Sequence, residues 1–289
     1  MTQTSASRTA LLLGVAALFP LAANSFLARL ALYEGHGDAA SYTVIRLLSG
    51  TAMLWLLLRL RGVKLPIAGR RRDWLAGAAL FIYAAGFSYA YLALHAGMGA
   101  LILFGAVQVG MIAIGRLEGE RMSAPAWLGW LMASAGLAWL VWPGLDAPPL
   151  WAAVLMALAG LAWAGYSLLG RRPGNPLHAT AGNFARATLL ALPLLLFGMS
   201  WDQWQPEAVA LAALSGAITS ALGYVLWYHA LPGLGASRAA TLQLAVPVIA
   251  AVASVVWLYE PLTMRLWLAG SAILCGVALT VLSRTRSGR

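Results

Sequence analysis

Ten stretches of mostly apolar residues, each roughly as long as a bilayer-spanning helix, limit the fold of this chain more than any other feature. A helix needs about 20 apolar residues to cross the hydrocarbon core of a bilayer, whereas a strand of a membrane barrel needs about 10 with alternating polarity. The stretches cover residues 10–32, 42–60, 74–95, 97–115, 125–142, 150–169, 178–199, 208–231, 236–259 and 264–282. The sequence therefore predicts an all-α, polytopic integral membrane protein with ten transmembrane helices and one membrane domain over residues 1–289.

The composition excludes an ordinary water-soluble enzyme. Only 10% of the residues are charged and 61% are hydrophobic, whereas a soluble domain has about 25% charged residues. The net charge of +10 does not indicate a nucleic-acid partner, because the basic residues lie in short gaps between the apolar stretches. The single cysteine, Cys275, excludes an internal disulfide and a cysteine-based metal cluster. We expect the lipid bilayer itself to be the main partner of the surface.

The basic residues also predict an orientation. If the chain begins in the cytoplasm, most cations fall on the cytoplasmic side and most carboxylates on the other, as the positive-inside rule requires. The cytoplasmic set is Arg8, Arg59, Arg61, Lys64, Arg70, Arg71, Arg72, Arg116, Arg121, Arg171, Arg172, Arg238, Arg284, Arg286 and Arg289. We therefore expect both termini in the cytoplasm.

The two halves of the chain resemble each other at an offset of about 140 residues, which predicts repeats over residues 1–143 and 144–289. Arg46, early in the second stretch, matches Arg186, early in the seventh, and Glu120 matches Glu260 at the ends of stretches four and nine. Each half has five helices, an odd number, so the second half enters the membrane from the opposite side. Inverted repeats are typical of secondary transporters that bind substrate near the midplane. The alternative is a duplication that only built a stable bundle.

On these residues the chain resembles the ten-helix EamA-type branch of the drug/metabolite transporter superfamily. Within it, the sequence is most similar to the YddG-type exporters of aromatic and other amino acids. The first repeat departs from the pattern, because Leu103 and Val107 stand where the second repeat has Gln243 and Pro247. The resemblance implies a secondary transporter that exports small metabolites, with aromatic and other neutral amino acids as the expected substrates. It would act by alternating access through a central cavity in a bacterial inner membrane, without a cofactor.

Catalysis and ATP-driven transport find no support in the sequence. It has no phosphate-binding loop, its one lysine is Lys64 in a connection, and its four histidines lack metal-ligand spacing. All nine carboxylates lie in connections or near the ends of the stretches, whereas ion-coupled carriers place one near the midplane. We predict no enzyme activity, no metal, no use of ATP, and facilitative transport.

Arg46 and Arg186 are the most informative charges. We place both about one turn inside their helices, where an unpaired charge costs several kcal/mol. Each is a gate or an anchor for a substrate carboxylate, or a structural arginine that binds helix-end carbonyls; we favour the structural role for both. Glu120 and Glu260 are expected to be structural caps or gate partners.

Two prolines lie inside apolar stretches beside an amide side chain. Pro247 frees the carbonyl of Gln243 from its helical hydrogen bond. Pro20, which lies one turn before Asn24, frees the carbonyl of Ala16. A polar amide next to a free carbonyl can hold an ammonium or a carboxylate in the bundle. For Gln243 and Asn24, a binding role and a harmless kink remain equally open.

Three aromatic residues fall near the middle of their stretches: Tyr83, Trp163 and Tyr224. Together with Gln243 they are predicted to line a central cavity, and the alternative is that they only pack helices together. Tyr83, Phe87 and Tyr91 share one helix face. Glycines are expected to let helices pack closely, namely Gly129, Gly136, Gly165, Gly223, Gly270 and Gly276.

The rival functions are export of cationic drugs, sugar phosphates or nucleotide sugars and, from a different class, a membrane-embedded enzyme. Phosphate-bearing substrates would need several cations in the cavity, and lipophilic cations usually need a central carboxylate. A neutral zwitterion fits the polarity of the stretches better. A membrane-embedded enzyme would need a nucleophile or a metal.

Overall fold

The computed structural model describes residues 3–32, 37–117, 123–144, 146–169, 175–197 and 205–286. The regular structure within these residues is helical throughout. Seven of the described helices are long and apolar enough to cross a membrane, and two shorter helices are also apolar. These findings confirm an all-α, polytopic membrane protein.

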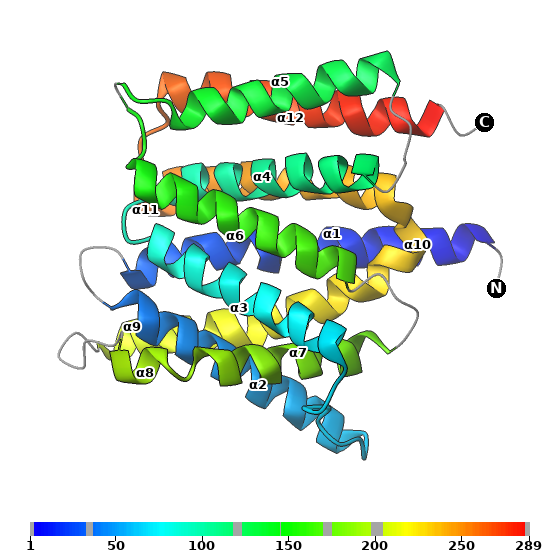
Figure 1. Ribbon diagram of the computed structural model, residues 1–289, viewed down its shortest axis with the longest axis vertical. Helices are drawn as coiled ribbons and strands as arrows, with labels where there is room; N and C mark the ends of the chain where they lie inside the picture. Colours follow the sequence, from blue (N-terminus) through cyan, green and yellow to red (C-terminus); the bar gives the residue numbers. More distant parts are fainter. Residues whose placement is uncertain are drawn as a thin grey trace.

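The described helices make ten crossings of the bundle when α7 is counted with α8, and α9 with η3 and α10. η3 is a segment of π-helix. Their bounds are α1 (Gln3–Leu32), α2 (Ala39–Leu60), α3 (Arg71–Ala90), α4 (Ala96–Leu117), α5 (Ala124–Val141), α6 (Leu150–Leu169), α7 (Pro176–Ala191), α8 (Leu194–Phe197), α9 (Pro206–Leu214), η3 (Ser215–Leu222), α10 (Gly223–Gln243), α11 (Ala245–Leu258) and α12 (Met264–Arg286). Successive crossings run in opposite directions, so α1 begins and α12 ends at the same end of the bundle (Figure 1).

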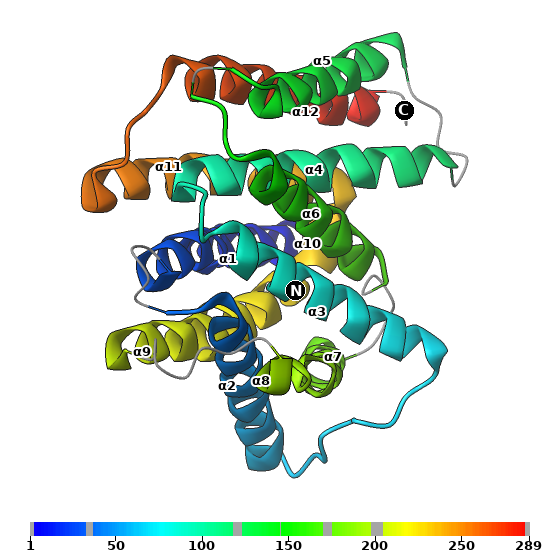
Figure 2. The same cartoon turned by 60° about the vertical axis from the view of Figure 1, so that its left-hand side comes forward.

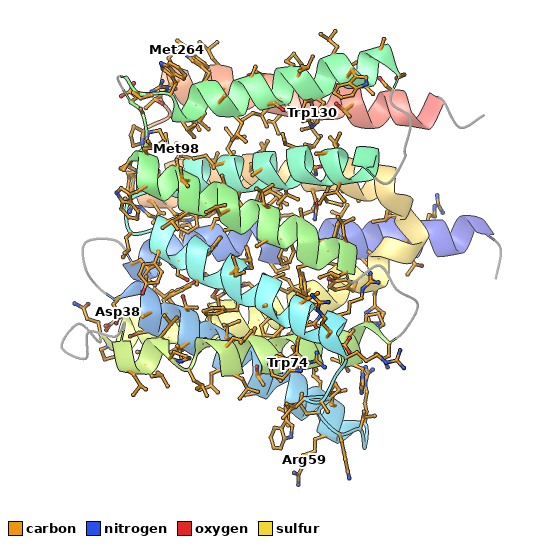
Figure 3. All side chains as sticks on the ribbon, in the orientation of Figure 1. Asp38, Arg59, Trp74, Met98, Trp130 and Met264 are labelled. Atoms are coloured by element: carbon orange, nitrogen blue, oxygen red, sulfur yellow. The ribbon has the colours of Figure 1, made fainter. Side chains whose placement is uncertain are left out.

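The two ends of the bundle differ in charge. The end where α1 begins, here called the basic end, carries Arg59, Arg61, Lys64 and residues 70–72 of the α2–α3 connection. The opposite, acidic end carries Asp38, Asp146, Glu207 and Glu260, together with Arg29 and Arg265. Figure 3 shows Asp38 and Arg59 at the opposite ends of α2.

The helices stack in layers, and the most extensive contacts between them come in equivalent pairs (Figures 1 and 2). The contact of α1 with α10 corresponds to that of α6 with α3. The contact of α11 with α1 corresponds to that of α4 with α6, and the contact of η3 with α2 corresponds to that of α3 with α7. Three further pairs, α2 with α7, α4 with α11 and α5 with α12, join equivalent helices. This pairing is what a pseudo-two-fold in the membrane plane would produce. The boundary of the repeats at residue 143 stays a prediction.

Side chains that cap helix N-termini set where several helices begin. The Asp38 carboxylate accepts a hydrogen bond of 2.7 Å from the Ser41 backbone N–H and also one from the Ser41 hydroxyl, so α2 begins at residue 39. Asn175 caps α7 in the same way, just before Pro176 at the first helical position. These caps satisfy N–H groups that have no partner within the helix.

Two parts of the predicted helix pattern differ from the structure. The predicted connection at residues 232–235, between stretches eight and nine, is helical, and α10 continues through it to Gln243. Proline has a helical φ, so a helix can continue through Pro232 at the cost of one backbone hydrogen bond. Stretch seven is interrupted, because α7 ends at Ala191 and a turn containing Pro193 separates it from α8.

The predicted close packing at glycine holds best between α5 and α12. A Cβ on Gly129 would lie 2.4 Å from the Gly276 carbonyl oxygen, and a Cβ on Gly276 would lie 2.5 Å from that of Gly129. The two backbones therefore touch where only glycine fits. The expectation was wrong for Gly165, where a Cβ would meet nothing within 4 Å.

Candidate functional site

Arg46 lies at the centre of a buried polar cluster. Because α2 begins at Ala39, three residues earlier than predicted, Arg46 is about two turns, or about 10 Å, inside the helix rather than one. Its side chain is 1% exposed. Nε donates to the Ser220 hydroxyl at 3.0 Å, and Nη2 donates to the Tyr83 and Tyr224 hydroxyls at 3.1 and 3.2 Å. The peripheral position that favoured a structural role is therefore absent for this arginine.

Aromatic rings surround this guanidinium. Its central carbon lies 4.8 Å from the ring centroid of Phe87 and 5.2 Å from that of Tyr83, within cation–π range. The Trp163 ring lies 4.8 Å from that of Tyr83 and 4.7 Å from that of Tyr224. The structure thus brings together the three aromatic residues that we placed mid-span, and it adds Arg46 and Phe87 to them.

Asn24 connects α1 to the same cluster. Its side-chain oxygen accepts hydrogen bonds from the hydroxyls of three residues on η3, Ser215, Thr219 and Ser220, at 2.8, 2.7 and 3.1 Å. Its amide nitrogen donates to the Pro20 carbonyl at 3.1 Å. Since Ser220 also accepts from Arg46, Asn24 is linked to the guanidinium through one hydroxyl.

The π-helical turn is the part of this site that the sequence analysis missed. Ser215, Thr219 and Ser220 lie at i, i+4 and i+5, a spacing that brings all three onto one side only where the helix widens. The run of hydroxyls was a usable signal, because polar side chains in an apolar stretch need internal partners. Pro20 packs on the same segment, since a Cβ on Gly223 would lie 2.9 Å from the Pro20 Cβ.

Two buried donor atoms of the cluster have no hydrogen-bond partner among the described residues. They are Nη1 of Arg46 and Nε1 of Trp163. The hydroxyls of Tyr166, Thr180 and Tyr228, on α6, α7 and α10, lie beside Trp163 and close to one another. Among the described residues no carboxylate forms an ion pair with Arg46. Buried polar groups are normally satisfied, so this concentration of unpaired groups marks a place where a ligand can supply the missing partners.

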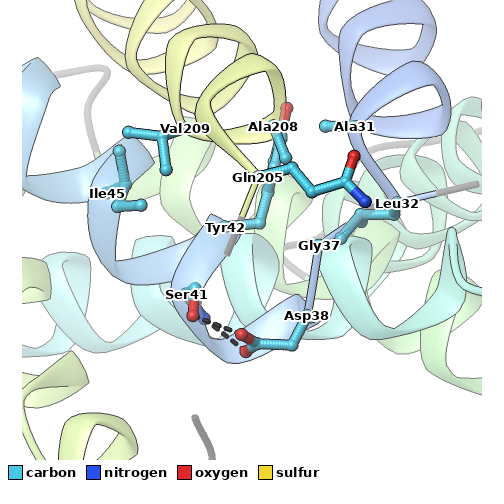
Figure 4. Close-up of a pocket in the computed structure, with 10 residues that line it drawn as sticks. All are labelled: Ala31, Leu32, Gly37, Asp38, Ser41, Tyr42, Ile45, Gln205, Ala208 and Val209. Atoms are coloured by element: carbon cyan, nitrogen blue, oxygen red, sulfur yellow. Dashed lines mark hydrogen bonds between the residues drawn. The ribbon is translucent and has the colours of Figure 1, made fainter. Parts of the chain in front are cut away.

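Aromatic side chains occupy the region where we predicted a cavity, because Tyr83, Trp163 and Tyr224 contact one another there. A small pocket of about 10 Å³ lies at the acidic end between α1, α2 and α9, with the hydrogen-bonded Asp38 and Ser41 at its edge (Figure 4). Tyr42 lines this pocket one helical turn before Arg46. The pocket and the cluster are therefore separated by a single turn of α2.

Arg186 has a different environment from Arg46. It is also buried, but it donates to three backbone carbonyls of the α2–α3 connection, those of Pro66, Ile67 and Ala68, at 3.0 to 3.1 Å. A fourth hydrogen bond of 3.3 Å goes to the Asn183 side chain. Arg186 thus binds carbonyls of a connection and not the helix-end carbonyls that we expected, and its structural role stays a prediction.

Glu260 holds together three elements at the acidic end. Its carboxylate pairs with Arg29 Nε of α1 at 2.9 Å, lies 3.2 Å from His95 Nδ1, and accepts from the Ala96 N–H at 2.7 Å. Burial acts to raise the pKa of Glu260, but His95, Arg29 and the Ala96 N–H together outweigh it, and the pKa is lowered. The carboxylate also caps the N-terminus of α4, where the helix dipole favours a negative charge.

The remaining predicted residues lie apart from the cluster. Gln243 is buried at the break between α10 and α11, and the interruption at Leu244 falls where Pro247 was expected to produce one. Pro247 lines an apolar groove of about 310 Å³ between α4, α11 and α12. None of the described contacts joins Gln243 to Tyr83, Trp163 or Tyr224. Glu120 lies outside the described residues.

The chemistry available at the cluster is that of an anion-binding site. Its unpaired atoms are N–H donors at and beside one cation. The described residues include no group of three histidine, cysteine or acidic side chains that could hold a metal ion.

Residues 150–282 match the EamA-like transporter family model. Over 277 residues the chain is 50% identical to an uncharacterized protein of Pseudomonas aeruginosa, covering 96% of each chain. The second half of the chain is an EamA-like transporter domain. An uncharacterized transporter of Archaeoglobus fulgidus is 28% identical over 120 residues, 42% of this chain and 43% of that one.

A solved crystal structure shares the fold of this EamA-like transporter. The two superpose with a TM-score of 0.67 at 21% identity, over 94% of this chain and 97% of the other. At that level of identity the likeness concerns the fold alone. The helical bundle and the family together indicate a membrane transporter.

Proposed function

We propose that this transporter exports small carboxylate-bearing metabolites, with aromatic and other neutral amino acids as substrates, from the cytoplasm across a bacterial inner membrane. The basic end faces the cytoplasm in this proposal, because positive residues stay on that side. Substrate binds at the Arg46 cluster and moves by alternating access between the two halves, down its own gradient.

The observation that carries the proposal is the state of Arg46. A buried charge in a membrane bundle costs several kcal/mol and normally has a partner of opposite charge. Among the described residues, Arg46 contacts only neutral hydroxyls and aromatic rings, and its Nη1 has no hydrogen-bond partner there. A substrate carboxylate would supply the missing charge and the missing hydrogen-bond acceptor.

Contacts at the acidic end are consistent with alternation. Arg29 of α1, Glu260 after α11 and the N-terminus of α4 meet there, and they come from both halves of the chain. An ion pair across two halves can hold that end closed and open when the halves rotate. The described carboxylates all lie at helix ends, which supports facilitation rather than coupling to a proton gradient.

The same cluster argues against the rival substrates. A cationic drug would be repelled by Arg46. Sugar phosphates and nucleotide sugars call for several cations, and the hydrogen bonds of Arg186 are already used by the α2–α3 connection. For an enzyme, a nucleophile beside a base would be required, and the cluster described here consists of hydrogen-bond donors.

Counterflow in proteoliposomes tests the proposal. Liposomes preloaded with unlabelled phenylalanine, tryptophan or leucine should accumulate the labelled amino acid. Arg46→Gln should slow this by about 10- to 100-fold, the worth of one hydrogen-bonded charge pair. Arg59→Gln is the matched control, because Arg59 is exposed on the same helix. Counterflow of no amino acid by the wild type would refute the proposal, and accumulation driven by a pH gradient alone would refute facilitation.

A further inference from the structure

The interior of the bundle carries an unbalanced positive charge. Five carboxylates are described, those of Asp38, Asp73, Asp146, Glu207 and Glu260, and all lie at helix ends or in connections. The other four acidic residues fall, along the sequence, in the segments between described helices. Arg46 therefore lies among the crossings with none of the five described carboxylates at its own depth.

The hydrogen-bonding groups around Arg46 are also one-sided. Nη1 of Arg46 and Nε1 of Trp163 can only donate, and both lack a partner. The main acceptor of the cluster, the Asn24 side-chain oxygen, already receives three hydroxyl hydrogens. This site can therefore bind a ligand group that supplies hydrogen-bond acceptors, but not a group that supplies only donors.

An ammonium group would find little to bind. Arg46 would repel it, the Asn24 oxygen is occupied, and no described carboxylate is near. The ring of Trp163 is already in contact with the rings of Tyr83, Tyr166 and Tyr224, at 4.7 to 5.4 Å between centroids. Its aromatic faces are therefore largely used by the protein itself.

We propose that the site recognises the carboxylate of its substrate and not the amino group, so that its preferred ligands are aromatic monocarboxylates of net charge −1. This inference rests on the proposed function and narrows it. Arg46 Nη1 binds the carboxylate, Trp163 Nε1 supplies a second donor, and a flat apolar body lies among the aromatic rings once alternation separates them. A monoanion neutralises Arg46 for the crossing, whereas a zwitterion leaves the loaded site with a net charge of +1.

The structure suggests where the rest of the ligand lies. Tyr166, Thr180 and Tyr228 place their hydroxyl groups close to one another on α6, α7 and α10, next to Trp163. Hydroxyls both donate and accept, so this side tolerates a neutral polar substituent such as a keto or phenol group. It offers no charge for a second ionised group.

Three ligands that differ in one group each test the proposal: 3-phenylpropionate, L-phenylalanine and phenethylamine. Dissociation constants are measured from the ligand-dependent rise in unfolding temperature of the purified, detergent-solubilised transporter. We expect 3-phenylpropionate to bind at least as tightly as phenylalanine, and phenethylamine to bind about tenfold or more weakly. Arg46→Gln and Arg46→Lys should both weaken 3-phenylpropionate binding, the lysine variant less, and Arg59→Gln should not.

The outcomes separate this inference from the proposed function. Binding of phenylalanine without binding of 3-phenylpropionate would show that the amino group is read, which overturns the inference and leaves amino acid transport standing. Tight binding of phenethylamine that survives Arg46→Gln would overturn both. Binding of none of the three, together with absent counterflow, would also overturn both.

Discussion

The two arginines that the sequence pairs should respond in opposite directions to the same substitution. Methionine is close to arginine in length and shape but carries neither charge nor hydrogen-bond donors. Arg46→Met removes a buried cation from neutral surroundings, and Arg186→Met removes the donor that holds the α2–α3 connection. The comparison separates a residue kept for a ligand from one kept for the fold.

For Arg46→Met, the change in the free energy of unfolding depends on the hydrogen bonds that the partners of Arg46 retain. Ser220 still donates to Asn24, and Tyr224 still donates to Tyr83, so the substitution leaves no described partner without a hydrogen bond. The substitution loses cation–π attraction of about 2 kcal/mol and hydrogen bonds of about 1.5–3 kcal/mol each, but it recovers a desolvation cost of several kcal/mol. Replacing buried ionic groups with apolar ones is commonly neutral or stabilising by about 1–4 kcal/mol. We therefore expect Arg46→Met to be between neutral and about 4 kcal/mol more stable than the wild type.

For Arg186→Met, the partners lose their donor. The carbonyls of residues 66–68 and the Asn183 side chain each lose a hydrogen bond from the guanidinium. Each buried acceptor left unpaired costs about 1–3 kcal/mol, and water can reach part of this connection at the basic end. We expect a loss of about 2–4 kcal/mol.

Equilibrium unfolding of both variants and the wild type by denaturant in one mixed-micelle condition measures the difference. The reasoning requires Arg46→Met to be at least as stable as the wild type while losing carboxylate binding, and Arg186→Met to be less stable. If Arg46→Met loses as much stability as Arg186→Met, Arg46 is a structural residue. The argument for an unneutralised site would then be wrong.

Three further predictions concern other parts of the molecule. Glu260→Gln should cost about 3–5 kcal/mol at pH 7, because it removes the buried ion pair between Glu260 and Arg29. Since folding lowers the pKa of Glu260, the wild type should lose this contribution as the pH falls below roughly 4.3, and unfolding of Glu260→Gln should show a weaker acid dependence. Gly216→Ala should destabilise by about 1–3 kcal/mol in the same unfolding assay, because its Cβ would lie 2.0 Å from the Arg46 carbonyl oxygen. Gly165→Ala, in open space, is the control and should be neutral or slightly stabilising. Cysteines introduced at Arg71 and at the C-terminal tail, in a Cys275→Ser background, should react with an impermeant reagent only from the cytoplasmic face; labelling from opposite faces would contradict the inverted repeat.

Much of the architecture could be read from the lengths and spacing of apolar residues. The ten stretches predicted ten crossings because a bilayer-spanning helix has to satisfy its own backbone over about 20 residues. The buried face of Tyr83, Phe87 and Tyr91 followed from helical spacing, and their rings do pack in sequence at 5.5 and 4.7 Å. The meeting of Tyr83, Trp163 and Tyr224 followed from their similar depth in three helices.

The differences lie where helix rotation and pairing decide the outcome. The sequence pairs Arg46 with Arg186, but one points into the centre of the bundle and the other onto a connection. From the sequence, we associated Asn24 with the carbonyl that Pro20 frees. In the structure, its side-chain oxygen accepts from hydroxyls on the π-helical segment η3, about 190 residues away in the chain. Gln243 shares polarity with the cluster but lies at the far end of α10.

The sequence by itself determines that this chain forms a bundle of membrane helices. It also determines that positive charge is in excess at one end of the bundle and that few charges lie within it. Both properties depend on composition and on spacing along the chain, because each segment interacts with the bilayer according to its own residues. The tertiary structure decides that Arg46 stands among tyrosines without a carboxylate, and that Glu260 pairs with Arg29 on a distant helix. Those contacts depend on how ten helices rotate and cross, which is set by side-chain packing over the whole bundle.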